Sequence, residues 1–218
     1  MREEVIKNVY EKRIIAIVRG LSAEESFQTA KALCEGGINM IEVTFNQAAD
    51  DGFCSTTAAI RRINEELGGQ VMAGAGTVMT VEQVKLAWEA GAKYIITPNT
   101  DEEIIRCASR LGLVTMPGAF TPTEIERAYE AGADFVKVFP VGQLGPDYIR
   151  AVRGPLSHIP LMAVGGIDET KLQVFLRAGA VGFGIGGNLV NRQWIKQGQF
   201  EKITELARLY VKNLQQEA

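Results

Sequence analysis

The sequence has one histidine, three cysteines and no long apolar run, and each shortage excludes a class of protein. His158 alone cannot supply the two or three imidazoles of a histidine metal site, so no metal is expected, and a serine–histidine triad would have to use it. Cys34, Cys54 and Cys107 show no CxxC spacing, which favours reduced thiols in a cytoplasmic protein over a disulfide framework. No apolar run approaches the roughly 20 residues of a membrane span, and the acidic start of the sequence does not resemble a signal peptide.

A strong charge of either sign is also missing. Of 218 residues, 46% are hydrophobic and 22% charged, and the formal net charge is -3, which is ordinary for a globular protein. This balance gives no reason to expect nucleic acid or a membrane as a partner. It is compatible with an anionic small substrate, which needs only a local cluster of hydrogen-bond donors.

Apolar runs alternate with helical patterns along the whole chain. Gly91, Gly112 and Gly132 each follow a helical pattern and lie about 20 residues apart, the size of one compact strand–helix unit. Strands are expected at residues 14–18, 40–44, 71–73, 94–97, 114–116, 135–139, 161–164 and 181–185. The sequence therefore predicts an α/β fold, a (β/α)8 TIM barrel that forms a single domain over residues 1–218, with a short helix at 1–13 and a final one at 200–214. A doubly wound sheet shares the alternation, but eight units and the lack of GxGxxG after the first strand favour the barrel.

Lys137 lies in the middle of the apolar run Phe-Val-Lys-Val-Phe-Pro. Because side chains alternate between the faces of a strand, Lys137 shares a face with Phe135 and Phe139, and Val136 and Val138 point the other way. Burial disfavours the ammonium form, and an amine with a lowered pKa can attack a ketone and form a Schiff base. The alternatives are a lysine paired with a buried carboxylate and a lysine that reaches water at the strand end.

Polar residues follow or end several of the predicted strands, where barrels of this kind have their active sites. Glu42 and Thr44 share a face of the second strand among apolar neighbours. A carboxylate inside a barrel is costly without a partner, so Glu42 is either in a structural ion pair with Lys137 or Arg19, or a general acid/base beside the Schiff base. The two roles are compatible because a lysine–glutamate pair titrates as a unit.

Two glycine pairs, Gly165-Gly166 and Gly186-Gly187, end the seventh and eighth predicted strands. Barrels of this kind commonly bind phosphate there, through bare backbone N–H groups and a helix N-terminus. Paired glycines are equally typical of tight turns. Arg19, after the first strand, could hold a carboxylate together with Thr77, or it could be a solvated charge.

The order of several motifs resembles one family. The motifs are Ile-Glu-Val-Thr at 41–44, Gly-Ala-Gly-Thr-Val at 74–78, Pro-Gly-x-x-Thr-Pro-x-Glu at 117–124, Lys-x-Phe-Pro at 137–140, Gly-Pro at 145–146 and the two glycine pairs. Together they resemble the class I 2-keto-3-deoxy-6-phosphogluconate aldolases, also called 4-hydroxy-2-oxoglutarate aldolases, over residues 14–190. The resemblance implies a cytoplasmic, homotrimeric barrel enzyme of Entner–Doudoroff carbohydrate metabolism, with no cofactor. It would cleave a 6-phosphorylated 2-keto-3-deoxy sugar acid to pyruvate and glyceraldehyde 3-phosphate, or 4-hydroxy-2-oxoglutarate to pyruvate and glyoxylate.

The resemblance also implies roles for particular residues. Lys137 would be the Schiff-base lysine and Glu42 the general acid/base, with Arg19 and Thr77 on the pyruvate carboxylate. The pocket would be lined by Thr44, Asn46, Pro98, Phe139 and Val164, and the phosphate would be held by Gly165, Gly166, Gly186, Gly187 and Asn188. The iminium would serve as the electron sink, so no metal is implied.

Three positions depart from the phosphogluconate pattern. Asn46 stands where an arginine is common, Val164 where a threonine precedes the glycine pair, and Asn188 where a serine often follows the second pair. Asn46 and Val164 instead resemble the 2-keto-3-deoxy-6-phosphogalactonate subgroup, whose substrate differs in configuration at C4. A valine cannot hydrogen-bond a substrate hydroxyl, so the preferred epimer stays open.

Two other functions are compatible with the same fold. A sugar-phosphate isomerase or epimerase would need another acid/base pair, often with metal-binding histidines, which the single His158 disfavours. A barrel that only binds sugar phosphates needs neither Lys137 nor Glu42, so the presence of both argues against it.

Overall fold

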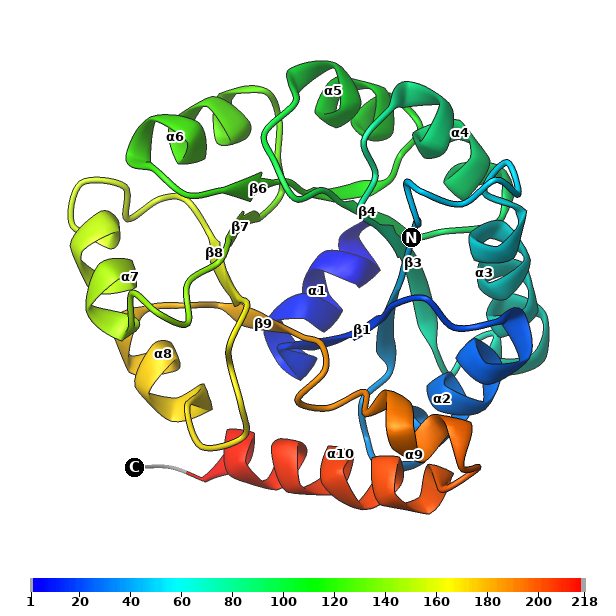
Figure 1. Ribbon diagram of the computed structural model, residues 1–218. Helices are drawn as coiled ribbons and strands as arrows, with labels where there is room; N and C mark the ends of the chain where they lie inside the picture. Colours follow the sequence, from blue (N-terminus) through cyan, green and yellow to red (C-terminus); the bar gives the residue numbers. More distant parts are fainter. Residues whose placement is uncertain (1, 217–218) are drawn as a thin grey trace.

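The computed structural model describes residues 2–216, in which helices alternate with strands and surround a parallel barrel (Figure 1). The strands are β1 (Ile14–Val18), β2 (Met40–Thr44), β3 (Met72–Gly76), β4 (Tyr94–Ile96), β5 (Val114–Met116), β6 (Gly118–Ala119), β7 (Val136–Val138), β8 (Leu161–Val164) and β9 (Gly182–Ile185). The helices are α1 (Arg2–Lys12), α2 (Ala23–Glu35), α3 (Cys54–Leu67), α4 (Val81–Glu89), α5 (Glu102–Arg110), α6 (Pro122–Glu130), α7 (Pro146–Arg153), α8 (Leu172–Ala178), α9 (Arg192–Lys196) and α10 (Phe200–Gln215). The predicted α/β TIM-barrel fold is confirmed.

The fifth barrel strand is divided in two. The hydrogen-bonded order of the sheet is β5-β4-β3-β2-β1-β9-β8-β7-β6, and Pro117 separates β5 from β6 because proline has no N–H to donate. The N–H of Phe135 donates to the carbonyl of Thr115 at 3.2 Å, and the N–H of Lys137 donates to the carbonyl of Pro117 at 2.9 Å. These bonds connect the two ends of the sheet, so the barrel is nearly closed.

Alternation along the strands gives the barrel an inner and an outer core. Phe135 packs in the inner core with Met40, Tyr94 and other residues that point to the barrel axis. Val136 and Val138 belong to the outer core between the sheet and the helices. The predicted faces of the strand around Lys137 are therefore confirmed. The strand is shorter than the predicted 135–139, because β7 spans only Val136–Val138, and Phe139 beyond its end is 36% exposed.

Helix α1 closes the amino end of the barrel. It crosses the middle of the barrel in Figure 1, and its Val5 and Val9 are fully buried in the inner core. An ion pair of 2.6 Å between Arg2 and Asp134 ties the start of the helix to the loop before β7. The carboxyl ends of the strands are thus left as the open end of the barrel. No helix within residues 2–216 is long and apolar enough to cross a membrane.

We expect Val9→Ala to lower the free energy of unfolding by about 2 kcal/mol, because it removes two methyl groups that are buried beneath the barrel. Val174→Ala is the matched control, since this α8 side chain is 37% exposed and its loss leaves no buried cavity. Both substitutions bring the same gain in helix propensity. Urea denaturation should show a lower midpoint for Val9→Ala alone; equal midpoints would mean that α1 does not pack into the barrel.

Candidate active site

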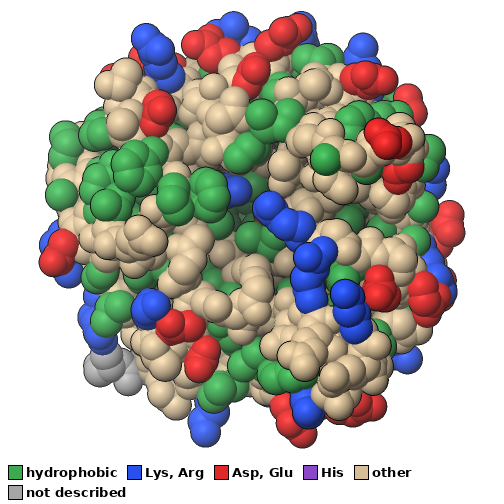
Figure 2. Space-filling model, viewed as in Figure 1, with side chains coloured by type: hydrophobic (Ala, Val, Ile, Leu, Met, Phe, Trp, Pro, Cys, Tyr) green, Lys and Arg blue, Asp and Glu red, His purple; other side chains and the backbone are tan. Residues whose placement is uncertain are grey.

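A cavity of about 630 Å³ opens at the carboxyl ends of β1, β7, β8 and β9. Figure 2 shows the hollow near the middle of this face, with lysine and arginine side chains at its edge. Nine of the residues proposed from the sequence line it, namely Arg19, Lys137, Phe139, Val164, Gly165, Gly166, Gly186, Gly187 and Asn188. Residues 120 positions or more apart in the chain meet here because all the strands are parallel and end on the same side.

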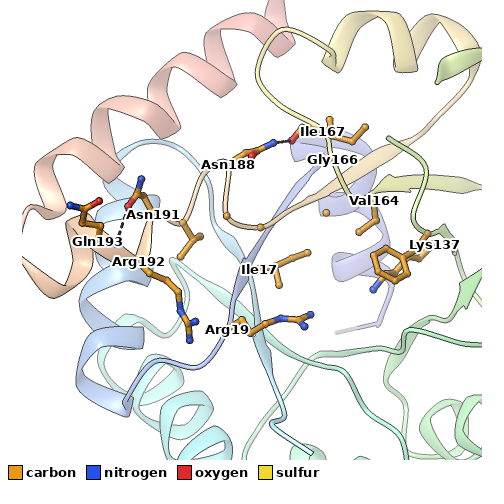
Figure 3. A pocket seen from close by; sticks show the side chains of 16 residues that line it. Ile17, Arg19, Lys137, Val164, Gly166, Ile167, Asn188, Asn191, Arg192 and Gln193 are labelled. Atoms are coloured by element: carbon orange, nitrogen blue, oxygen red, sulfur yellow. Dashed lines mark hydrogen bonds between the residues drawn. The ribbon is translucent and has the colours of Figure 1, made fainter. Parts of the chain in front are cut away.

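Lys137 projects into this cavity from the middle of β7 (Figure 3). Its side chain is 6% exposed, and its Nζ lies 4.8 Å from the centroid of the Phe139 ring. Burial lowers the pKa of Lys137, the charge of Glu42 raises it, and the charge of Arg19 lowers it further. The net direction is down, so a larger fraction of Lys137 is the neutral, nucleophilic amine than in an exposed lysine.

Glu42 lies on β2, fully buried inside the barrel. A Cβ at Gly76 on the adjacent strand would overlap the Glu42 carboxyl group, so this glycine provides the space that the acid fills. Burial raises the pKa of Glu42, and the charges of Lys137 and Arg19 oppose the shift. Within residues 2–216 the carboxyl group accepts no hydrogen bond and forms no ion pair. Glu42 therefore interacts with Lys137 through the electrostatic field, without a hydrogen bond or an ion pair between them.

Thr77 occupies the turn after β3 in a left-handed conformation, with φ of 52°. This region is rarely adopted by a β-branched residue, and such strain is concentrated at functional sites. A chain of hydrogen bonds holds the turn: Gln47 Nε2 donates to the Thr77 carbonyl at 2.7 Å, and Gln83 Nε2 donates to Gln47 Oε1 at 2.9 Å. The N–H of Met79 donates to Gln83 Oε1 at 2.6 Å, and Gln83 is fully buried. Neither glutamine is among the residues proposed from the sequence, since a single polar residue in a helix pattern is a weak signal.

Five residues proposed for the site do not line the cavity, namely Glu42, Thr44, Asn46, Thr77 and Pro98. Thr44 is buried on the same strand as Glu42. Asn46 is exposed in the loop after β2, where its Oδ1 accepts the N–H of Ala48 at 3.1 Å. Pro98 lines a smaller hollow of about 340 Å³ together with Phe139. Phe139 therefore separates the two hollows.

The two glycine loops present unused backbone donors to the cavity. Gly165 and Gly166 have φ of 92° and 77°, a conformation that favours glycine. The N–H groups of Gly166, Gly187 and Asn188 donate to no acceptor in the part of the chain that the structure describes. Asn188 Nδ2 donates to the carbonyl of Ile167 at 2.9 Å and ties the loops together (Figure 3). The donors belong to loops rather than to a helix N-terminus, because α9 begins only at Arg192.

The cavity also has a wall that no sequence motif indicates. Ile17 and Ile167 contribute apolar surface, and Asn191, Arg192 and Gln193 approach from the turn into α9. These residues could not be proposed from the sequence, because their position over the barrel depends on how the chain folds back after β9.

The single histidine lies elsewhere. His158 is exposed just before β8, at the opposite end of the strands from the cavity, and its ring meets Tyr129 edge-on with 5.4 Å between centroids. Among the described residues, no three His, Cys, Asp or Glu side chains form a group that could hold a metal ion.

Comparison with known proteins identifies a family and several relatives. The family described as KDPG and KHG aldolase matches residues 5–206. A probable 2-dehydro-3-deoxy-6-phosphogalactonate aldolase of Rhizobium meliloti (strain 1021) is 38% identical over 180 residues, 82% of each chain. A 2-dehydro-3-deoxy-phosphogluconate aldolase of Treponema pallidum (strain Nichols) is 34% identical over 197 residues, 89% of this chain and 90% of the relative. A solved native KDPGal structure superposes with a TM-score of 0.82 at 34% identity, over 92% of this chain and 93% of the other.

We expect the pKa of Lys137 to lie below that of an exposed lysine and to move in opposite directions in two variants. Glu42→Gln removes a charge that favours the ammonium and should lower the pKa further, whereas Arg19→Gln removes a repelling cation and should raise it. NMR titration of protein with 13C-labelled lysine side chains would follow both shifts. Arg106→Gln on α5 removes an exposed cation away from the cavity and should leave the titration unchanged. Shifts of the same sign in Glu42→Gln and Arg19→Gln would contradict the opposite effects that these two charges are expected to have on the pKa of Lys137.

Proposed function

Because this chain belongs to the KDPG and KHG aldolase family, we propose that it is a class I aldolase that cleaves a 6-phosphorylated 2-keto-3-deoxy sugar acid to pyruvate and glyceraldehyde 3-phosphate. The observation that carries the proposal is the buried Lys137 amine, with its lowered pKa, facing the cavity. Such an amine can form an imine with the C2 ketone of the substrate. The isomerase and simple binding functions lose their support, since the family consists of lyases.

The first step joins the substrate to Lys137. The neutral amine attacks C2, and the resulting carbinolamine loses water to give an iminium. In the proposal, Arg19, which lines the cavity, binds the C1 carboxylate in bidentate fashion and so fixes C2 near the amine. Thr77, in the turn after β3 outside the cavity lining, is proposed to assist it. Glu42, whose pKa is raised by burial, supplies the proton that turns the carbinolamine hydroxyl into leaving water.

The second step breaks the C3–C4 bond. Glu42, now ionised, takes the proton of the C4 hydroxyl as the bond electrons move into the iminium and form an enamine. Glyceraldehyde 3-phosphate leaves as the aldehyde. The enamine then takes a proton at C3, and water hydrolyses the new iminium to release pyruvate and the free amine. One carboxyl group whose pKa is shifted toward neutrality can serve each transfer in turn.

The unused N–H groups of the glycine loops support binding of the substrate phosphate. In the proposal, Gly166, Gly187 and Asn188 donate through their backbones, together with Gly165 and Gly186. We also propose the homotrimer and the cytoplasmic location that the family resemblance implies.

For the preferred epimer, we propose the galactonate configuration. Val164 lines the cavity, at the end of β8 directly before the Gly165-Gly166 pair. In the proposal, its apolar side chain meets the part of the substrate between the reacting carbons and the phosphate. The similarity to the probable phosphogalactonate aldolase of Rhizobium meliloti supports the same choice. The phosphogluconate epimer and 4-hydroxy-2-oxoglutarate are secondary substrates in this proposal.

We expect incubation with pyruvate and borohydride to add one reduced pyruvate to Lys137, detected by peptide mass spectrometry. Lys137→Ala should give no adduct. Glu42→Gln is the matched variant within the site: it should keep some adduct formation but lose most turnover, since the amine is intact and the proton donor is not. An intact protein that is never trapped would exclude the Schiff-base mechanism. Full turnover in Glu42→Gln would assign the proton transfers to another group.

We expect Val164→Thr to shift the ratio of kcat/KM between the two epimers toward the phosphogluconate substrate by roughly tenfold, because the added hydroxyl can hydrogen-bond a substrate hydroxyl that valine cannot. Val174→Thr on the exposed face of α8 is the control and should leave the ratio unchanged. Steady-state kinetics with both epimers would measure the ratio, and identical ratios in Val164→Thr and the parent protein would show that this residue does not set selectivity.

A further inference from the structure

We propose that Arg192 is a ligand of the terminal phosphate of the substrate and supplies the positive charge that the glycine loops lack. This inference rests on the function proposed above. It concerns a residue that lies outside the family motifs described above and that reaches the cavity from α9.

The short helix α9 places Arg192 over the cavity. Asn191 caps the helix, its Oδ1 accepting the N–H groups of Gln193 at 2.9 Å and Trp194 at 3.2 Å. Ile195 is buried in the outer core and anchors the helix to the barrel. Arg192 extends toward Arg19, and Lys137 lies across the opening (Figure 3).

Gly20 forms the contact surface that holds the Arg192 side chain, which we call the seat of Arg192. Its carbonyl accepts a hydrogen bond from Arg192 Nη2 at 2.9 Å, and its φ of 63° is left-handed. A Cβ at this position would overlap the guanidinium, so the close approach requires glycine. A guanidinium has five N–H donors and only one is used here, so the seat fixes the group and leaves most of its donors available to a ligand.

Among the described residues, no carboxylate lies within ion-pairing distance of this guanidinium. Within residues 2–216, neither Arg19 nor Arg192 forms an ion pair. The pKa of Glu25 does respond to the charge of Arg192. Hydrogen bonds from Ser22 lower that pKa most, however, and the contribution of Arg192 is the smallest of the causes. The carboxylate of Glu25 accepts the N–H of Ser22 at 2.8 Å, in the capping box of α2. An unneutralised arginine in a cavity that also presents free N–H groups is a site for an anion.

The chemistry of the substrate indicates which anion Arg192 binds. A phosphate monoester carries about -1.5 to -2 charges at neutral pH, and the donors of the glycine loops are neutral. A guanidinium adds a charge-assisted, bidentate contact that backbone N–H groups cannot provide. Arg19 is taken by the C1 carboxylate in the proposed mechanism, so Arg192 is left for the other end of the substrate.

The test compares a phosphorylated 2-keto-3-deoxy sugar acid with its unphosphorylated counterpart. We expect Arg192→Gln to raise KM for the phosphorylated acid about tenfold or more, with kcat changed little. KM for the unphosphorylated acid and borohydride trapping with pyruvate should stay as in the parent protein. Calorimetry with inorganic phosphate alone should show weaker binding to Arg192→Gln. Arg192→Lys should fall between the two, because it keeps the charge but not the planar fork.

Lys196→Gln is the matched control: it removes a cation one turn along α9, at a residue that does not line the cavity, and should leave both KM values unchanged. Gly20→Ala should raise KM for the phosphorylated acid in the parent protein and add little in Arg192→Gln, since both changes act on one seat.

Two results would overturn the inference. One is unchanged phosphate binding and KM in Arg192→Gln. The other is an equal rise of KM for both acids, which would mean that Arg192 only holds the Gly20 turn. Failure of the proposed function is a separate outcome: the parent protein would then form no adduct with pyruvate, while the calorimetry with phosphate would still test Arg192.

Discussion

The rest of the structure depends on keeping two ionisable groups, Lys137 and Glu42, away from water in one barrel. Burial shifts the two pKa values toward each other, lowering that of the amine and raising that of the acid. Removing such groups from water opposes folding, and within residues 2–216 the Glu42 carboxyl group receives no hydrogen bond that would offset this cost. The stability must come from the apolar layers around them: the inner core that α1 closes and the outer core beneath the helices. The site is reactive because it is poorly solvated, and the fold tolerates it because the rest of the barrel is densely apolar.

The barrel interior is divided along its axis. The half at the amino ends of the strands is filled by large side chains such as Tyr94 and Phe135, and helix α1 closes it. Toward the carboxyl ends of the strands, Gly76 and Gly118 have no side chains, which would otherwise occupy the space of Glu42 and of the Pro98 backbone. Small residues on the strands thus determine where the cavity can form, and the glycine loops add backbone N–H donors to its wall. The same barrel therefore has one end for stability and one for chemistry.

The sequence was sufficient to predict the barrel and the centre of the site. Most of the predicted strands follow a helix that ends at a glycine, at regular intervals. Because the ends of parallel strands must meet, the order of residues alone places Lys137 and the two glycine pairs together. The positions of residues on the connections between strands and helices could not be predicted from the sequence. Asn46 turns back to bond its own loop, and Pro98 faces the smaller hollow beside Phe139. Arg192 reaches the cavity from a helix of five residues, whose course depends on tertiary packing rather than on a local pattern.

The two causes that lower the pKa of Lys137 differ in how they respond to substrate. The charge of Arg19 disfavours the ammonium, but a bound carboxylate would neutralise that charge and so weaken its effect on the amine. Burial is the larger cause, and a substrate that fills the cavity excludes more water and strengthens it. If Arg19 were the main cause, binding would protonate the nucleophile just when it is needed. Because burial is the larger cause, the pKa of the amine stays lowered as the anionic substrate arrives. A protein with a net charge of -3 can therefore place Arg19 and Arg192 beside the opening while the pKa of Lys137 is still set mainly by burial.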